Sequence, residues 1–191
     1  MSHWSQFNQN TKNNPPRGLY VEALKFLKSD DVLALDIGAG ACNETKDMLS
    51  RGFSVVAIDS NQEIQEIAAT INSANLTVNV SNAENYTYGN DRYDFIIAMF
   101  ALPFIEPSSF KNTFSKIMKS LKPGGMFAFH LFGVNDEWAA SRSMTFFDEE
   151  SAKELFGSNK QLLFKEFDYD GKTADGSKKH WHIIECILEK S

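Results

Sequence analysis

Two glycines and an aspartate are spaced as in a nucleoside-binding site. Gly38 and Gly40 follow an apolar run and stand just before a polar, helical segment that begins at Asn43. Glycines at such a turn let the backbone bend sharply and approach a ligand closely. A second apolar run ends in Asp59, where a carboxylate can accept hydrogen bonds from both hydroxyls of a ribose. The spacing therefore predicts a nucleoside site.

The charge around the turn distinguishes between nucleoside ligands. A dinucleotide site binds a pyrophosphate through backbone amides and carries a small residue three places after the second glycine, but Asn43 occupies that place. Asp36, two residues before Gly38, would repel a phosphate and attract a cation. S-adenosylmethionine (SAM) carries an ammonium and a sulfonium group on an adenosine, so SAM is the predicted cofactor. An NAD- or nucleotide-binding oxidoreductase and a SAM-binding protein without transfer activity are the alternatives.

Residues 36–42 resemble the first motif of the class I SAM-dependent methyltransferases, Asp-x-Gly-x-Gly-x-Gly. Cys42 replaces the third glycine, at a position that mainly has to be small so that the helix packs against the strand. Three further segments resemble this family in the expected order. Residues 78–84 resemble a short strand with the turn that lies beside the adenine, and residues 93–100 resemble the fourth strand, whose end lies under the methionine part of the cofactor. Residues 121–129 resemble the loop before the fifth strand and the start of that strand. The resemblance covers about residues 17–190.

The resemblance implies the fold, the reaction and the residues that bind the cofactor. The fold would be α/β, a Rossmann-like doubly wound sheet of seven mostly parallel strands in the order 3-2-1-4-5-7-6, with strand 7 antiparallel and helices on both faces. The enzyme would transfer the methyl group of SAM. Together, the motifs and the N-terminal segment give the residues expected to bind SAM: Arg17, Asp36, Gly38, Ala39, Gly40, Asp59, Ser60, Ala83, Glu84 and Met99.

Two segments resemble a smaller group within this family. Residues 132–138, Phe-Gly-x-x-Asp-Glu-Trp, and residues 179–182, Lys-His-Trp-His, look like small single-domain bacterial enzymes related to the tellurite-resistance methyltransferases. Those enzymes act on small molecules or metalloid oxyanions, which implies a small-molecule acceptor here. DNA and RNA amino-methyltransferases carry an Asn-Pro-Pro-Tyr type tetrapeptide at the end of strand four, whereas Met-Phe-Ala-Leu stands at 99–102.

The elements that must position these residues follow from hydrophobic periodicity. Expected strands cover about 32–37, 54–59, 76–81, 93–99 and 126–132, and expected helices cover about 43–51, 61–73, 109–121 and 148–156. Their alternation indicates a parallel sheet covered on both faces. Two longer runs, 162–169 and 180–188, flank a turn-rich segment and predict an antiparallel hairpin. We expect one domain over 1–191, with residues 1–28 as an N-terminal lid whose helix, 19–27, forms a flap and not core scaffold.

Methyl transfer from a sulfonium requires mainly that the nucleophile be held in line and that water be excluded. A thiol or another soft anion attacks unaided, whereas an oxygen or amine acceptor usually needs its proton removed. His130, near the end of the fifth strand, is the catalytic candidate, with a hydrogen-bonded structural histidine as the alternative. His180 and His182 lie on one face of a strand with Trp181 on the other, either in the substrate pocket or in strand packing. The sequence indicates no third ligand for a metal at this pair.

Aromatic and cationic residues complete the predicted substrate pocket. Arg17 carries a guanidinium fork that matches a carboxylate, and with Tyr20 it stands at the start of the flap helix, although a solvated surface position is the alternative. Trp138 follows the fifth strand, either as a wall for the substrate or as a cap on the core. The residues expected around the substrate are Tyr20, Phe100, Trp138, His180 and His182.

Composition excludes several function classes. A chain of 191 residues, 42% of them hydrophobic, is long and apolar enough for one well-packed domain. Its 19 basic and 25 acidic residues give a net charge of -6, so nucleic acid and anionic membranes are not expected as partners. The N-terminus is polar, and the longest nearly apolar stretch, 95–105, is too short to span a bilayer. Cys42 and Cys186 lack metal-ligand spacing, so no bound metal is expected. We expect the protein to be soluble and cytoplasmic, as a monomer or a homodimer.

Overall fold

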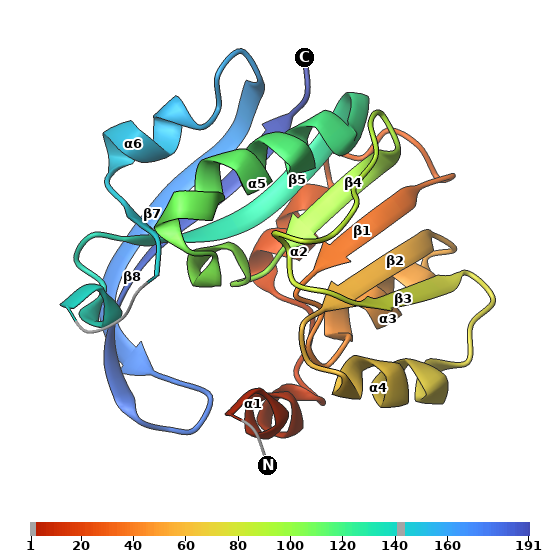
Figure 1. Ribbon diagram of the computed structural model, residues 1–191, viewed down its shortest axis with the longest axis horizontal. Coiled ribbons are helices and arrows are strands. Elements are labelled where there is room, and N and C mark those ends of the chain that lie inside the picture. The colour runs from red at the N-terminus through yellow and green to blue at the C-terminus, as the bar shows by residue number, and fades with distance from the viewer. Residues whose placement is uncertain (1–2, 141–143) are drawn as a thin grey trace.

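A mostly parallel sheet forms the centre of the fold (Figure 1). The computed structural model describes residues 3–140 and 144–191, and its sheet has the strand order β3-β2-β1-β4-β5-β8-β7. The strands are β1 (Leu33–Ile37), β2 (Ser54–Asp59), β3 (Leu76–Val80), β4 (Tyr93–Ala98), β5 (Leu121–Gly133), β6 (Phe146–Phe147), β7 (Lys160–Lys172) and β8 (Lys178–Glu189). β8 runs antiparallel to β5 and to β7, and the two-residue β6 pairs with β5 outside this path. The predicted order 3-2-1-4-5-7-6 is confirmed, since β7 and β8 are the predicted strands 6 and 7.

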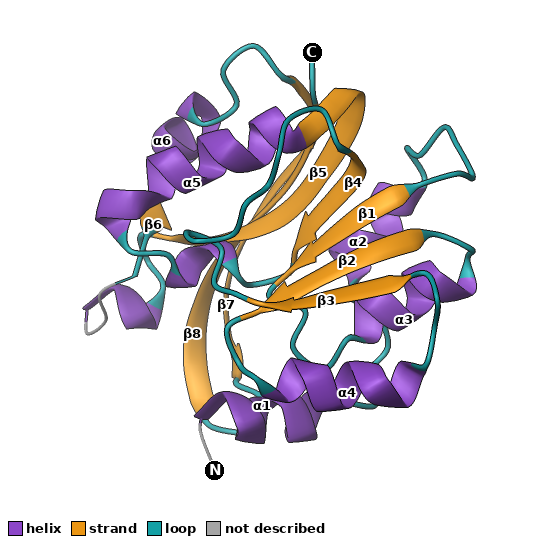
Figure 2. Cartoon of the chain, turned by 45° about the vertical axis from the view of Figure 1, so that its right-hand side comes forward, coloured by secondary structure: helices purple, strands orange, loops and turns teal. Residues whose placement is uncertain are grey.

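Helices cover both faces of the sheet (Figure 2). They are α1 (His3–Thr11), α2 (Gly18–Leu24), α3 (Asn43–Ser50), α4 (Glu63–Ile71), α5 (Pro107–Ser120) and α6 (Glu149–Glu154), with two short 3-10 helices, η1 (Leu102–Phe104) and η2 (Glu137–Ala140). α2, α3 and α4 pack on one face, and α5 and α6 pack on the other. Within residues 3–140 and 144–191, no helix is both long enough and apolar enough to cross a membrane.

Burial on both faces explains why the central strands are nearly continuous apolar runs. In β1, Leu35 and Ile37 join the core beneath α5, and Ala34 joins the core beneath α2 and α3. Asp36 lies between them as an ionisable side chain that is only 2% exposed. A carboxyl group buried at the end of a central strand needs polar partners, and it therefore marks the place where the site is built.

The C-terminal hairpin is longer than predicted. β7 and β8 contain 13 and 12 residues and extend beyond the predicted strands 162–169 and 180–188. Figure 1 shows the hairpin curving away from the rest of the sheet toward α1. In the hairpin turn, the carbonyl of Ala174 accepts a hydrogen bond from the side-chain amide of Asn10 at 3.1 Å. The far end of the hairpin therefore contacts the N-terminal helix.

The N-terminal segment contains a helix, α1, that hydrophobic periodicity does not predict. Its buried side chains are polar, namely Ser5, Asn8 and Thr11, so they form no apolar repeat. The side-chain amide of Asn43, the first residue of α3, donates to the carbonyl of Thr11 at 2.9 Å. Hydrogen bonding thus fixes α1 beside the glycine turn that precedes α3.

The structure contradicts the expectation that residues 19–27 form a flap. α2 ends at Leu24, and its side chains Leu19, Tyr20 and Ala23 are buried in the core that α2 shares with α3. Three such side chains on one side of a short helix remove more surface from water by packing on the sheet than by crossing an open cleft. The role of residues 1–28 as a lid stays a prediction.

Candidate active site

The turn after β1 has a backbone geometry that favours glycine. Gly38 and Gly40 have φ of 71° and 51°, in the left-handed region. A Cβ atom on Gly38 would lie 2.6 Å from the Cβ of Ala101, so this close approach requires glycine. Cys42, at the third glycine position of the motif, also has a left-handed φ of 58° and is fully buried. A small thiol fits there, and the departure from the motif leaves the turn intact.

Asp59 supports the turn from the neighbouring strand β2. Its Oδ2 accepts a hydrogen bond from the backbone N–H of Gly40 at 2.9 Å, and its Oδ1 accepts one from the N–H of Asn61 at 2.8 Å. Each carboxylate oxygen can accept more than one hydrogen bond. The carboxylate is therefore held in one orientation and keeps acceptor capacity for a ligand.

Asp36 lies in an acidic environment. The hydroxyl of Thr45 donates to its Oδ2 at 2.6 Å. Burial, followed by the negative charge of Glu44, raises the pKa of Asp36 to about 8. At neutral pH this carboxyl group is mostly protonated until a cation approaches it. The ammonium group of a ligand would be such a cation.

Arg17 precedes α2 and reaches into the site. Its backbone N–H donates to Oε1 of Glu44 at 2.9 Å, and its guanidinium carbon lies 4.7 Å from the ring centroid of Phe100. Burial lowers the pKa of Arg17, but a guanidinium remains charged at physiological pH. A partly desolvated guanidinium beside an aromatic ring is suited to bind a carboxylate.

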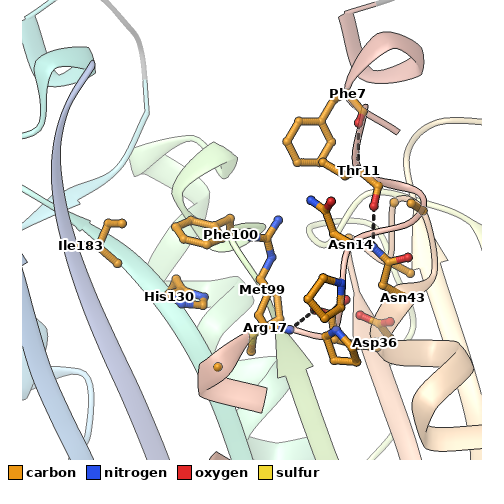
Figure 3. A pocket seen from close by; sticks show the side chains of 18 of the residues that line it. Phe7, Thr11, Asn14, Arg17, Asp36, Asn43, Met99, Phe100, His130 and Ile183 are labelled. Carbon is orange, nitrogen blue, oxygen red and sulfur yellow. Dashed lines mark hydrogen bonds between the residues drawn. The ribbon is translucent and has the colours of Figure 1, made fainter. Parts of the chain in front are cut away.

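Two adjoining cavities, of about 530 and 700 Å³, lie at the carboxyl ends of the parallel strands, where open α/β sheets bind ligands. Both are lined by Arg17, Gly38, Gly40, Met99 and Phe100. The smaller cavity is also lined by Asp36, Ala39, His130 and Glu185, and Figure 3 shows Asp36 and His130 there. The larger cavity also contains Asp59, Ser60, Ala83, Glu84, Trp138 and Trp181. Every residue predicted to bind SAM therefore lines one of these cavities or both.

His130 lies in β5 on the wall of the smaller cavity and is 3% exposed. Its Nε2 is 3.4 Å from Oε1 of Glu185 on β8, and its Nδ1 is buried without a hydrogen-bond partner among residues 3–140 and 144–191. Burial lowers the pKa of His130, and Glu185 acts against that shift. If the neutral imidazole carries its proton on Nε2, Nδ1 is a proton acceptor. Whether His130 acts as a general base stays a prediction.

Phe100 lies where the two cavities meet, just after β4. Its φ of 61° is rare for a bulky side chain, and such strain is concentrated at functional sites. Its ring stacks on the imidazole of His130, with the centroids 4.0 Å apart and the planes 8° from parallel. Figure 3 shows Arg17, Phe100 and His130 gathered at one side of the cavity.

The structure contradicts the placement of Tyr20 in the substrate pocket. Tyr20 is fully buried, and its hydroxyl donates to Oδ2 of Asp47 in α3 at 2.6 Å. Its ring stacks on Phe95 in β4, with centroids 6.2 Å apart. Because α2 packs on the sheet, this side chain belongs to the core and not to the cavity wall.

The structure also contradicts the placement of His180 and His182 in the substrate pocket. His182 is 3% exposed and forms a pair with Glu166, and His180 lies 2.7 Å from Asp168. Side chains alternate along β8, and Trp181 takes the cavity face. His180 and His182 lie on the face of the strand opposite Trp181, as predicted, but the cavity is on the side of Trp181 and not on the side of the histidines.

Several contributors to the site were not predicted. Phe7 and Thr11 of α1 line both cavities, although the sequence predicts no helix before residue 19. Glu44 approaches Asp36 from the start of α3, and Glu185 approaches His130 from β8. The alternation of side chains along a strand could have identified Glu185, because it places Glu185 on the same face of the strand as Trp181.

Residues 34–125 match a protein family described as a methyltransferase domain. The match extends from β1 to the start of β5 and includes the glycine turn and Asp59. The chain carries a methyltransferase domain. This domain has the class I fold. No curated protein matches the sequence.

Solved structures similar to this methyltransferase share its fold at low identity. TehB from Haemophilus influenzae has a TM-score of 0.80 and 17% identity over 97% of this chain and 66% of that one, so this chain spans about two thirds of the length of TehB. The Burkholderia thailandensis 1,6-didemethyltoxoflavin-N1-methyltransferase, solved with 1,6-didemethyltoxoflavin and S-adenosylhomocysteine (SAH), has a TM-score of 0.66 and 18% identity over 91% and 79% of the chains. The N-methyltransferase NodS from Bradyrhizobium japonicum, in complex with SAH, has a TM-score of 0.69 and 15% identity over 98% and 97%.

Proposed function

We propose that the protein transfers the methyl group of SAM to a small-molecule acceptor by in-line displacement. The observation that carries this proposal is the continuity of the site, because one cavity contains both Asp59 and the aromatic side chains Trp138 and Trp181. Cavities of about 530 and 700 Å³ suit a cofactor together with a small acceptor. A structural neighbour solved with 1,6-didemethyltoxoflavin supports an acceptor of this kind.

Three charged side chains are proposed to hold the cofactor. Asp59, already oriented by two backbone N–H groups, accepts the ribose hydroxyls. Asp36 binds the ammonium group, because a cation restores the charged form of a carboxyl group whose pKa is raised to about 8. Arg17 binds the carboxylate of the methionine part. The remaining proposed contacts are Gly38, Ala39 and Gly40 at the turn, Ser60, Ala83 and Glu84 beside the adenosine, and Met99 beside the methionine part.

The chain's own residues would hold the acceptor, exclude water and receive a proton. When bound, SAM supplies an electrophilic methyl group activated by its sulfonium. Phe100 lines both cavities, so it is placed to orient the acceptor toward the methyl group. His130 accepts the proton of an oxygen or amine acceptor, as its unpartnered nitrogen allows.

Helix α1 is proposed as the lid within residues 1–28. It extends from the glycine turn to the hairpin, through the bond from Asn43 to Thr11 and the bond from Asn10 to Ala174. Trp4 packs on Phe104 with ring centroids 4.9 Å apart. A helix that contacts both ends of the crevice is placed to enclose the ligands and to exclude water.

A methyl-transfer screen tests the proposal. The protein is incubated with methyl-labelled SAM and with thiols, metalloid oxyanions, amines and small carboxylic acids, and labelled products are separated by size. We expect label in at least one small product, and much less of it after Asp59→Ala at the same subsaturating SAM concentration. Label found only in added protein or nucleic acid would refute the small-molecule acceptor. Label that never leaves bound SAM would indicate a binding protein without transfer activity.

A further inference from the structure

We propose that the acceptor is a planar aromatic compound whose nucleophile is a hydroxyl or N–H group, and that Glu185 positions His130 to remove its proton. This inference rests on the proposed function and deepens it. Two independent features carry it: the aromatic wall of the larger cavity and the His130–Glu185 pair of the smaller one.

The larger cavity ends in aromatic side chains from separate elements, and we call this set the aromatic wall: Phe100, Phe104, Phe132, Trp138, Tyr169 and Trp181. The centroids of Phe132, Trp138 and Trp181 lie 5.7 or 5.8 Å apart in pairs, and their planes meet at 59–68°. Rings held at such angles offer both faces and edges to a further ring. A flat aromatic molecule can stack or pack edge to face on them, whereas a saturated molecule gains only from the area that it buries.

A buried ion pair fixes the aromatic wall in place. Lys179 is 3% exposed, pairs with Asp136, and places Nζ 3.7 Å from a ring centroid of Trp181 and 4.4 Å from one of Trp138. Asp136 also accepts a hydrogen bond from the backbone N–H of Trp138 at 3.0 Å. Because the Lys179 ammonium contacts both indoles and Asp136 holds the backbone at Trp138, this part of the wall has its shape before an acceptor arrives, which reduces the entropy lost on binding.

The His130–Glu185 pair indicates a nucleophile that carries a proton. A thiolate or another soft anion would need no base, yet Nδ1 of His130 is buried without a hydrogen-bond partner in the part of the chain that the structure describes. The register of β5 and β8 places His130 directly opposite Glu185, with Nε2 3.4 Å from Oε1. A carboxylate at that nitrogen keeps a proton on Nε2 and leaves Nδ1 as the acceptor. An acceptor with an O–H or N–H group supplies the missing partner once the side chains that bury Nδ1 move aside.

The proposed step balances in atoms and charge. The O–H or N–H bond of the acceptor breaks, and the proton goes to Nδ1 of His130. The electron pair of the nucleophile forms the bond to the methyl carbon, and the C–S bond breaks with its electrons on sulfur. Positive charge moves from sulfur to the imidazolium of His130, which the carboxylate of Glu185 stabilises.

Binding of two matched compounds tests the aromatic wall. Calorimetry with SAH-saturated protein compares 1-naphthol with decahydro-1-naphthol, which has the same carbon skeleton without aromatic rings. We expect 1-naphthol to bind at least tenfold more tightly, and Trp181→Leu to remove most of this preference. Equal binding of the two compounds, or no binding of 1-naphthol, overturns the acceptor class. Failure of SAH itself to bind would refute the proposed function instead.

Rates with two nucleophiles test the role of Glu185, and the hairpin provides a control. His182 and Glu166 form a second histidine–carboxylate pair, on the face of β8 opposite Trp181. Transfer to 1-naphthol and to 1-naphthalenethiol is measured from the lowest pH at which each protein stays folded up to pH 9, in the parent, in Glu185→Gln and in Glu166→Gln.

For 1-naphthol, Glu185→Gln should lower kcat/KM by about tenfold or more and move the acidic limb of the pH profile to lower pH, because the carboxylate raises the pKa of His130. The loss for the thiol should be at least tenfold smaller, since thiols ionise more easily. Glu166→Gln should leave both profiles unchanged. Equal losses for the two nucleophiles, an unshifted acidic limb, or no transfer to bound 1-naphthol overturns the assignment.

Discussion

The affinity for SAH should depend on pH through one buried carboxyl group. Burial and the charge of Glu44 raise the pKa of Asp36 to about 8, so at lower pH the free protein must lose a proton before Asp36 can pair with the ammonium of SAH. Below that pKa, each fall of one pH unit raises the free-energy cost of ionising Asp36 by about 1.4 kcal/mol. We therefore expect the affinity to rise about tenfold between pH 6 and pH 7.

The dependence should level off above about pH 8, because Asp36 of the free protein is then already ionised. Asp36→Asn keeps the shape of the side chain but cannot ionise, so its affinity should stay nearly constant over the acidic limb. The ratio of parent to variant affinity should accordingly grow about tenfold between pH 6 and pH 7.

Calorimetry measures this ratio directly, and buffers of different ionisation enthalpy count the proton released on binding. Adenosine is the matched control ligand, since it lacks the amino group and should bind with no comparable slope in this range. If Asp36→Asn retained the slope of the parent, or if adenosine showed the same slope, Asp36 could not be the group that binds the ammonium.

Three further changes test other parts of the structure. Asp59→Ala removes a charged acceptor from two ribose hydroxyls and should weaken SAH binding by about 1.5 to 3 kcal/mol in calorimetry; an unchanged affinity would exclude Asp59 from the site. Deletion of residues 1–12, which contain α1, should preserve a cooperative melting transition but lower SAH affinity, and SAH should slow hydrogen exchange in α1 of the full chain; full affinity after the deletion would refute the lid. Lys179→Met leaves Asp136 buried without its counter-charge and should cost about 3 to 5 kcal/mol of unfolding free energy in urea denaturation; a loss below about 1 kcal/mol would show that Asp136 does not need this cation.

The cofactor half of the crevice was predictable because its residues stand at the ends of parallel strands. Gly38, Asp59 and Met99 each follow or end an apolar run, and parallel strands end at one edge of the sheet. Local pattern and strand order therefore place these residues together without knowledge of any side-chain contact. α1 could not be found in this way, because its buried face is held by hydrogen bonds of polar side chains and not by an apolar repeat.

The acceptor half depends on a choice that hydrophobic pattern cannot make. Both faces of β8 are covered, since Ile184 packs in the core beneath α5 and Ile183 packs beside the aromatic wall. Only the pairing of β8 with β5 decides that Trp181 and Glu185, and not His182, face the cavities, and a shift of one residue would exchange the two faces. Substitutions at the cavity-facing positions of β8 can therefore alter the acceptor while the glycine turn, Asp59 and the sheet stay as they are. Within this fold, acceptor specificity is expected to vary through the hairpin and cofactor binding to persist through the strand ends.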